Sequence, residues 1–367
     1  MSDPRPYAAL TDAALEPTEF STLSGWLFDN HREALAVFLR SAEAVMNRRV
    51  ELRSARVAPD QFRRFAEKVL RADIADPRRF FETNFLLYRI IPKQGSGFLT
   101  GYYEPEISGS LIQSADFPVP VLARPSDLIS FGVDDTPPDF SARGLSGARK
   151  DGTKLVPYFD RASIEDGALR DQGLELLYLP DRIELFFAQV QGSARIRLPD
   201  GRLKRLTYAG RNGHPYTTIA KVIREEGHMA LEDIHLESLK VWLRTHPKDA
   251  NRIMRLNRSY IFFSLSEDLP ENEGPIGASS IPLTSMRSIA IDRLQWCYGL
   301  PFFIHARLPD QKGQLTDFSR IMVAQDTGSA ILGAARADLY MGSGEQAGYR
   351  AGRIRHPGDF FVLIPKA

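Results

Sequence analysis

The chain has 367 residues, 43% hydrophobic and 25% charged, so it can bury a large core and is long enough for two domains. Its 47 basic and 46 acidic residues leave a net charge of +1, which gives no global attraction to nucleic acid or to an anionic membrane. The single cysteine, Cys297, excludes an intrachain disulfide and a zinc–thiolate cluster, and the seven histidines show no metal-ligand spacing. We therefore expect no metal, no cofactor and no nucleic-acid partner.

The sequence predicts helices in the N-terminal part of the chain. Apolar residues recur at helical spacing over residues 24–48, Asp60 is the expected N-cap of a second helix, and Pro77 fits the first turn of a third helix after Asp76. From Phe85 the branched, apolar run NFLLYRIIP predicts a strand, and residues 97–110, GFLTGYYEPEISGS, predict a second strand. The helical stripes indicate core packing and not a ligand site.

Tyrosines and an acid lie where the second strand is expected to end: Thr100, Tyr102, Tyr103 and Glu104. Aromatic rings cover the apolar face of a pyranose, while hydroxyls and carboxylates bond to its rim. Two interpretations remain open, a sugar-binding cluster and an ordinary strand end with one tyrosine in the core. Residues 111–155, rich in Pro, Ser, Gly and Asp, carry little functional information.

From residue 174 the sequence predicts a strand, a helix and a hairpin, with the hairpin strands at 194–198 and 203–208 around a Pro-Asp-Gly turn. Just before the hairpin, a glutamine and a serine at a glycine break offer amide and hydroxyl groups to a hydroxylated ligand. His214 then has two interpretations, a catalytic base and a histidine that bonds only within its loop.

Helices are expected around residues 236–243 and 248–256, followed by a strand over 259–265. The polar stretch SEDLPENEGP, residues 266–275, is typical of a linker. Beyond it the sequence predicts only strands and turns, which favours a closed β-barrel over a layered α/β fold.

Two carboxylates bracket a short loop within residues 321–352. An apolar run leads to Asp326, a Thr-Gly-Ser turn follows, and Asp338 comes 12 residues after the first acid. The glycines of this segment suit tight turns and close ligand approach better than regular helix. The two acids are either a catalytic site or turn residues on a solvated rim.

Here the sequence resembles a known family. DTGSAILGAARADLY, which contains both acids, resembles the "3D" segment of the lytic murein transglycosylase A (MltA) family. Four further blocks resemble that family in the same order: GFLTGYYEP, VQGS before a DG hairpin, YAGRNGHPY and GASSIPL. Five ordered blocks, from about residue 85 to residue 352, make the resemblance specific.

The resemblance implies a mainly β fold with N-terminal helices (α+β), a double-psi β-barrel interrupted by an inserted second β-rich domain. Residues 1–103 and 272–367 would form the helices and the barrel, residues 104–271 the insert, and glycan would lie in the groove between them. The implied protein is a periplasmic monomer, at the outer membrane, that binds peptidoglycan strands. Family members are usually lipoproteins with a cysteine after a signal peptide, and since this sequence shows neither, we expect no membrane anchor in this chain.

The implied activity is that of a peptidoglycan lytic exotransglycosylase, which cleaves the β-1,4 bond between N-acetylmuramic acid and N-acetylglucosamine and leaves 1,6-anhydromuramic acid ends. The 6-hydroxyl of the muramic acid attacks its own C1, so one carboxyl can act first as acid and then as base. By resemblance Asp338 has that role. Asp326 is expected to raise the pKa of Asp338 by like-charge repulsion and to share its hydrogen bonds.

The substrate-binding residues that the matched blocks imply are Thr100, Tyr102, Tyr103, Glu104, Gln191, Gly192, Ser193, Asn212, Tyr216, Ser279, Ser280 and Gly328. Two other classes of protein remain as alternatives. An aspartic protease shares the Asp-Thr-Gly-Ser turn, but it needs two such segments and this chain has one. A non-catalytic glycan-binding protein would use the same barrel without turnover.

Overall fold

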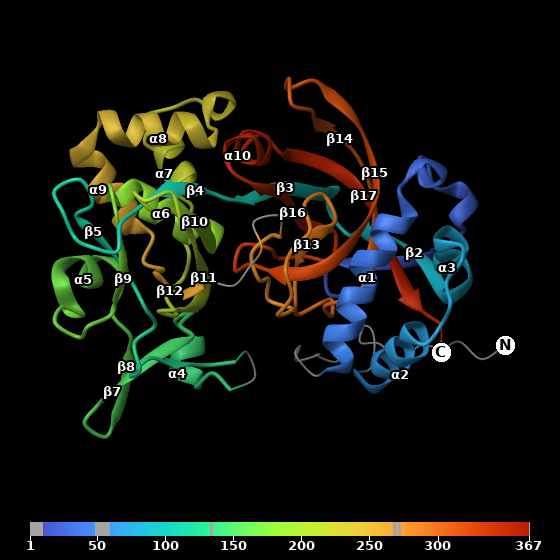
Figure 1. The fold of residues 1–367 in the computed structure, drawn as a ribbon, viewed down its shortest axis with the longest axis horizontal. Coiled ribbons are helices and arrows are strands. Elements are labelled where there is room, and N and C mark those ends of the chain that lie inside the picture. Colours follow the sequence, from blue (N-terminus) through green and yellow to red (C-terminus); the bar gives the residue numbers. More distant parts are fainter. Residues whose placement is uncertain (1–9, 48–58, 133–134, 267–269, 271–272, 367) are drawn as a thin grey trace. The chain divides into compact units, whose positions relative to one another are not determined.

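The computed structural model describes residues 10–47, 59–132, 135–266, 270 and 273–366 (Figure 1). Its contacts divide into two compact units. The first, here called the barrel unit, contains residues up to 103, residues 271–342 and residues 346–367. The second, here called the middle unit, contains residues 104–270 and 343–345. Parts of the expected linker, 267–269 and 271–272, lie outside the described residues.

Six strands of the barrel unit form a closed ring. Their order is β17-β14-β15-β13-β16-β3, and the pairing of β3 with β17 closes it. β13 runs parallel to β15 and antiparallel to β16. The bounds are β3 (Gly97–Glu104), β13 (Ser288–Ile291), β14 (Pro301–Pro309), β15 (Leu315–Thr327), β16 (Arg336–Ser343) and β17 (Arg355–Pro365). The expected closed β-barrel is confirmed, whereas its double-psi connectivity stays a prediction.

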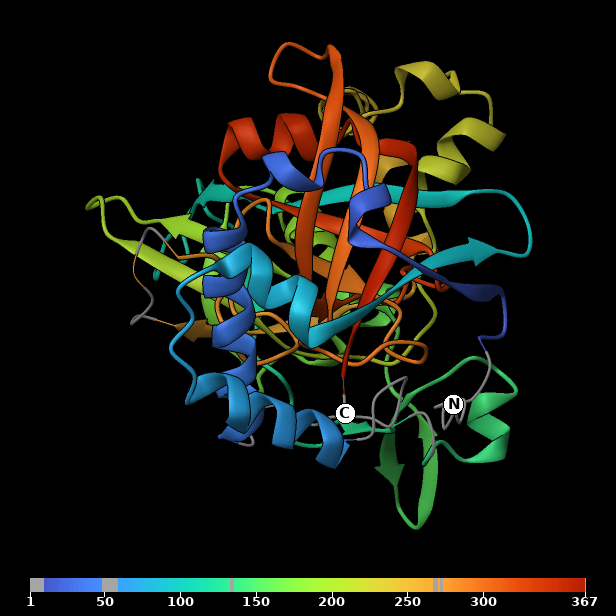
Figure 2. The same ribbon diagram turned by 90° about the vertical axis from the view of Figure 1, so that its right-hand side faces the viewer.

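Two more strands and three helices complete the barrel unit. β2 (Phe85–Pro92) pairs with β17, and β1 (Ala13–Thr18) pairs with β2. The helices are α1 (His31–Met46), α2 (Pro59–Leu70) and α3 (Pro77–Asn84). In Figure 2 the blue α1 lies beside the orange and red strands, and it contacts β15.

The three predicted N-terminal helices are present, but the first residues of α1 and α2 differ from the prediction. α1 begins at His31 and not near residue 24, because two short 3₁₀ turns precede it and the Asn30 side chain accepts the Glu33 N–H as N-cap. Asp60 lies within the first turn of α2 and is not its cap. Asp76 caps α3 as predicted, since its carboxylate accepts the Arg79 N–H at 3.0 Å.

One helix of the barrel unit contradicts the expectation of strands and turns only. α10 (Glu345–Ala351) follows β16, after Gly342 and Gly344 turn the chain with φ of +106° and +84°. Small residues let α10 approach β3 closely: a Cβ at Gly348 would lie 2.7 Å from the Tyr103 ring. The glycines that suggested a loop thus serve the entry and the packing of a helix.

The middle unit is built on a four-stranded sheet of order β12-β11-β10-β4, with short satellite sheets and helices. The predicted hairpin is confirmed: β10 and β11 pair antiparallel, with Ser193 opposite Thr207. The second predicted strand is interrupted at Pro105, which separates β3 from β4. The bounds are β4 (Glu106–Ser108), β5 (Val119–Leu122), β6 (Ile129–Ser130), α4 (Pro138–Ser141), β7 (Gly147–Asp151), β8 (Lys154–Pro157), α5 (Arg161–Ser163), β9 (Glu175–Leu179), α6 (Arg182–Gln191), β10 (Ser193–Arg197), β11 (Leu203–Arg211), α7 (Ile219–Glu225), α8 (Leu236–Thr245), α9 (Pro247–Leu256) and β12 (Ile261–Ser266).

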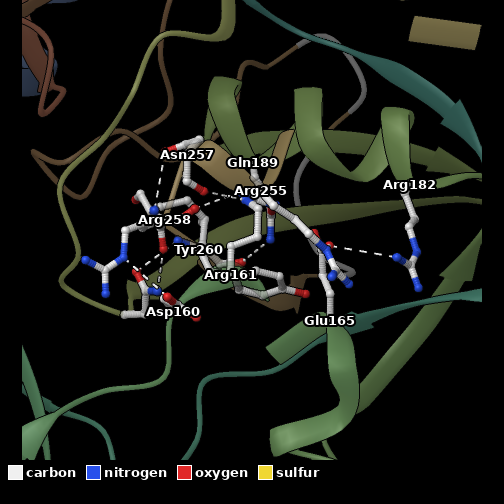
Figure 3. Close-up of polar contacts among 12 residues, drawn as sticks. Asp160, Arg161, Glu165, Arg182, Gln189, Arg255, Asn257, Arg258 and Tyr260 are labelled. Carbon is white, nitrogen blue, oxygen red and sulfur yellow. Dashed lines mark hydrogen bonds and ion pairs between the residues drawn. The ribbon is translucent and has the colours of Figure 1, made fainter. Parts of the chain in front are cut away.

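A buried arginine links three segments of the middle unit (Figure 3). The Arg161 guanidinium, 2% exposed, donates to the Asn257 carbonyl at 2.9 Å, to the Ser259 carbonyl at 2.7 Å and to Gln189 Oε1 at 2.8 Å. Glu165 supplies the opposite charge at 3.5 Å. Every partner is internal to the fold, so this cation has a structural role.

Among the residues that the structure describes, no helix combines the length and the apolar character that a membrane crossing needs.

Candidate active site

The two acids that bracket the loop lie on strands, on either side of β13. Asp326 stands near the end of β15 and Asp338 in β16, and both are in register with Ala290 of β13. Two strand spacings therefore separate their backbones, about 10 Å. Both side chains are half-buried. They are strand residues, and the interpretation as turn residues on a solvated rim is wrong.

Asp338 is held by one hydroxyl. Thr100 Oγ1 donates to Asp338 Oδ1 at 2.7 Å, and Arg336 Nη2 donates to Thr100 Oγ1 at 2.7 Å. Side chains two apart on a strand share a face, which places Arg336 beside Asp338 on β16. Among the described residues Asp338 Oδ2 has no hydrogen-bond partner, so this oxygen can meet a ligand.

Asp326 is held by three donors. The Tyr102 hydroxyl donates to Oδ2 at 2.8 Å, and the backbone N–H groups of Ala278 and Thr327 donate to Oδ1 at 3.0 and 2.9 Å. Ala278 belongs to the GASSIPL block, so the carboxylate ties that block to the end of β15. Asp326 is thus positioned to organise backbone as well as to influence its neighbour.

Burial determines the electrostatics of both acids. It raises the pKa of Asp338 to about 6, against the charge of Arg336 and the hydrogen bond from Thr100, which lower it. Burial also raises the pKa of Asp326, and its three hydrogen bonds oppose that rise. The pKa of Tyr102 lies well above its ordinary value, mainly through burial and then through the charge of Asp326, so its hydroxyl stays a donor.

The structure corrects the expected effect of Asp326 on the pKa of Asp338 and the expected sharing of hydrogen bonds. The charge of Asp326 does raise the pKa of Asp338, but it is the smallest of the causes, and burial is the largest. Each acid also has its own hydroxyl, Thr100 or Tyr102, so they do not share hydrogen bonds. The backbones of the two acids lie on either side of β13, and each carboxylate meets a different hydroxyl of β3.

The remaining expected residues of the barrel unit differ in exposure. Tyr103 is buried against Gly348, on the face of β3 opposite to Thr100 and Tyr102. Ser279 is buried, with its N–H bonded to the Gln325 carbonyl at 3.0 Å, whereas Ser280 is exposed. Gly328 is half-buried and its carbonyl accepts the Ile331 N–H at 3.0 Å.

Glu104 of the middle unit lies in an ion cluster. Its carboxylate, 0% exposed, lies 2.8 Å from Arg195 Nε and 2.7 Å from Arg205 Nε, and it accepts the Ser343 hydroxyl at 2.7 Å. The structure therefore shows a structural role for this acid. Its contact with substrate stays a prediction.

The α6–β10 junction carries three more expected residues. Gln191 is the last residue of α6, Gly192 is its left-handed C-cap, and Ser193 begins β10 as a buried residue. Gln191 and Gly192 are half-buried. Their role in binding stays a prediction.

The block YAGRNGHPY is organised around buried backbone contacts. Asn212 donates to the carbonyls of Phe159 and Arg258, both at 2.9 Å, and accepts the Tyr260 N–H. His214 Nε2 lies 2.7 Å from the Tyr158 carbonyl, and burial lowers its pKa, so it is the loop histidine of the two interpretations and not an accessible base. Tyr216 is half-buried.

Two groups of the site were missed from the sequence. Arg336 had a usable signal, because it stands two residues before Asp338 in an apolar strand. The Ala278 N–H had none, since every residue except proline supplies a backbone donor. No group of three or more His, Cys, Asp or Glu side chains within the described ranges gathers as metal ligands would.

Two protein-family models match the sequence: the "MltA specific insert domain" over residues 98–264 and the "3D domain" over residues 287–364. The membrane-bound lytic murein transglycosylase A of Escherichia coli K12 is 32% identical over 274 residues, which cover 73% of this chain and 66% of that protein. This chain thus spans slightly less than two thirds of that relative.

Solved structures agree with the sequence matches. A membrane-bound lytic murein transglycosylase from Agrobacterium tumefaciens has a TM-score of 0.86 and 35% identity, over 96% of this chain and 98% of that one. The structure of E. coli MltA with bound chitohexaose has a TM-score of 0.63 and 25% identity, over 99% of this chain and 95% of that one. Matching blocks, barrel and sequence identity lead to one conclusion: the chain belongs to the MltA family of lytic murein transglycosylases.

Proposed function

We propose that this protein is a lytic transglycosylase of peptidoglycan. It cleaves the β-1,4 bond between N-acetylmuramic acid and N-acetylglucosamine and leaves a 1,6-anhydromuramic acid end. The observation that carries the proposal is the state of Asp338: half-buried, held at one oxygen by Thr100, with a pKa of about 6. Such a carboxyl retains a proton under mildly acidic conditions and can give it to a leaving group.

The reaction needs one proton shuttle. Asp338 donates its proton to the glycosidic oxygen as the C1–O bond breaks, through a transition state with oxocarbenium character. The 6-hydroxyl of the muramic acid then bonds to C1 and returns its proton to Asp338. No water is consumed, and the carboxyl ends as it began. The free oxygen, Oδ2, is the atom proposed to carry the proton, because Oδ1 already accepts from Thr100.

The other polar groups support this acid. Thr100 orients the Asp338 carboxyl, and Arg336 orients Thr100 in turn. Asp326 fixes Tyr102 and the backbone of Ala278 beside the site. A relative of known structure is described with bound chitohexaose, a chain of β-linked amino sugars, which supports a glycan as the ligand of this chain too.

Further parts of the proposal rest on family membership. The relatives are named membrane-bound enzymes, which supports a periplasmic location at the outer membrane. We retain the double-psi connectivity, the insertion of residues 104–271, exo-acting cleavage, a monomeric state and the remaining expected binding residues as proposals.

The direct test is mass spectrometry of peptidoglycan digested by the purified protein. The proposal predicts 1,6-anhydromuropeptides from the natural chain, at least about 100-fold less product from Asp338→Asn in the same time, and unchanged products from the control Asp317→Asn, an exposed acid of β15. Products one water heavier, with reducing ends, would identify a hydrolase. Glycan binding without any product would identify a binding protein, and cleavage of peptides irrespective of glycan would identify a protease.

A further inference from the structure

The barrel unit contains a pocket of about 380 Å³ next to the proposed acid. One wall is the segment before β1, with Thr11 and Asp12, and another is the connection from β2 to β3 with the start of β3, where Lys93 and Phe98 lie. The third is the entry to β16, where Leu332 and Arg336 lie. Its size is within the range of small-ligand sites. None of the expected substrate-binding residues lines it.

The pocket has two cations and two apolar surfaces. Lys93 is exposed and donates to the Thr11 carbonyl at 2.9 Å, a contact that uses one of its three N–H groups. The Arg336 guanidinium lies 5.4 Å from the centroid of the Phe98 ring, which is 43% exposed.

The acid that lines the pocket, Asp12, already accepts a hydrogen bond from the protein. Asp12 Oδ2 accepts the Ala334 N–H at 3.1 Å, and Leu332 beside it is exposed. Two cations and one carboxylate leave the lining of the pocket with a net positive charge, which favours an anionic ligand, and the exposed ring and aliphatic side chain favour a ligand that also carries methyl groups.

Arg336 connects the pocket to the catalytic carboxyl. It lines the pocket, donates to Thr100 and stands two residues from Asp338 on the same face of β16, a distance of about 7 Å along the strand. The reacting C1 of the muramic acid must lie at Asp338. The same sugar carries a lactyl group and its peptide on C3, so the peptide begins within about one sugar ring of the reacting atom.

We propose that this pocket binds the peptide stem of the muramic acid that reacts at Asp338. The inference rests on the proposed transglycosylase function and extends it to substrate choice. Carboxylates of the stem would pair with Lys93 and Arg336, and its alanine methyl groups would lie on the Phe98 ring and on Leu332. The protein would then act on peptide-bearing strands in preference to bare glycan.

The test compares two substrates: intact strands that carry peptides and strands whose peptides an amidase has removed. The variants are Lys93→Ala and Phe98→Ala. Each has a matched control outside the pocket: Lys366→Ala, an exposed lysine that also donates to a carbonyl, that of Thr83, and Phe28→Ala, a 92% exposed ring. We expect KM on peptide-bearing strands to rise about three- to tenfold in the pocket variants, as for partly exposed ionic and apolar contacts.

On bare glycan the pocket variants should match the natural protein, and the controls should match it on both substrates. An equal loss on both substrates would overturn the inference, because the variants would then affect the fold or the catalytic groups. Unchanged kinetics of both pocket variants on peptide-bearing strands would also overturn it.

A binding measurement separates this inference from the proposed function. Calorimetry with a soluble N-acetylmuramyl peptide needs no turnover. We expect binding by the natural protein and by Lys366→Ala, and binding weakened about three- to tenfold by Lys93→Ala. Peptide binding without any cleavage of strands would refute the transglycosylase proposal alone, whereas cleavage without peptide binding would refute the pocket.

Discussion

Glu104 is a buried acid and Asp338 a half-buried one, and their surroundings are opposite. Glu104 is fully buried between the guanidinium groups of Arg195 and Arg205. Asp338 is half-buried, and its direct protein partner is the neutral hydroxyl of Thr100, with Arg336 on the far side of that hydroxyl. Among the described residues no ion pair within 4.0 Å involves Asp338.

The surroundings of Glu104 suit a carboxylate that stabilises the fold, whereas those of Asp338 suit a carboxyl that takes part in the reaction. A buried carboxylate with two counter-ions is satisfied in its ionised form, and losing either partner leaves an uncompensated charge. A buried carboxyl without direct counter-ions favours its protonated form, which is what a general acid needs. Substitutions at the two acids should therefore have different consequences, one for activity and one for stability.

The largest expected effect is on turnover. Asp338→Asn keeps the shape and the hydrogen bond from Thr100 but removes the proton donor, so turnover should fall by roughly 10²–10⁴, or more because one residue serves both steps. Asp326→Asn should keep measurable turnover, since its partners are two backbone groups and Tyr102. Initial rates of both variants on the same glycan check this.

Glycan binding should survive in Asp338→Asn. Above pH 6, where the natural carboxyl is mostly ionised, tighter binding by Asp338→Asn is consistent with the account, because less charge is desolvated. Loss of binding together with turnover would instead indicate that the substitution damages the site as a whole.

The second effect is on stability. Glu104→Gln removes the buried negative charge that faces the guanidinium groups of Arg195 and Arg205 and should lower the free energy of unfolding by roughly 3 kcal/mol. The matched control is Glu106→Gln, since Glu106 pairs with Arg197 at 2.6 Å on the surface and should contribute less than about 1 kcal/mol. Urea unfolding of both variants gives the comparison. Equal losses would contradict the distinction between the buried and the exposed pair.

The smallest effect is on the pH profile. Asp338 must hold its proton to begin the reaction, so kcat/KM should fall as pH rises through its pKa of about 6. Arg336 lowers this pKa, so Arg336→Gln should move the alkaline limb to higher pH while also slowing the reaction. Asp326 raises it least, so Asp326→Asn should move the limb slightly to lower pH. Shifts in the same direction would contradict these electrostatic assignments.

Local signals predicted local structure. Asp76 before Pro77 specifies the start of α3, and the branched run that ends at Pro92 specifies β2. The turn at Asp200 and Gly201 specifies the hairpin of β10 and β11 in the same way. α10 was missed because its glycines resemble those of a loop, and their packing role depends on Tyr103, far away in the chain.

The sequence did not reveal which residues far apart in the chain become neighbours. Glu104 next to two tyrosines suggested a sugar site, but its counter-ions stand 91 and 101 residues away, where no spacing rule reaches. The identity of the two acids was accessible from the motif that contains them. Their placement on either side of β13 was not, since it depends on which strands become neighbours. The expected repulsion by Asp326 does raise the pKa of Asp338, whereas the expected sharing of hydrogen bonds was wrong.

The central claim is that Asp338 holds a proton where an ordinary aspartate would not. The most direct measurement is a pH titration of the side-chain carboxyl carbons by NMR, on protein labelled with ¹³C aspartate, with the Asp338 signal assigned by its absence in Asp338→Asn. The account predicts a midpoint of about 6 for this signal. A midpoint near the ordinary value of 3.8 would contradict it, because the carboxyl would then be ionised before substrate arrives.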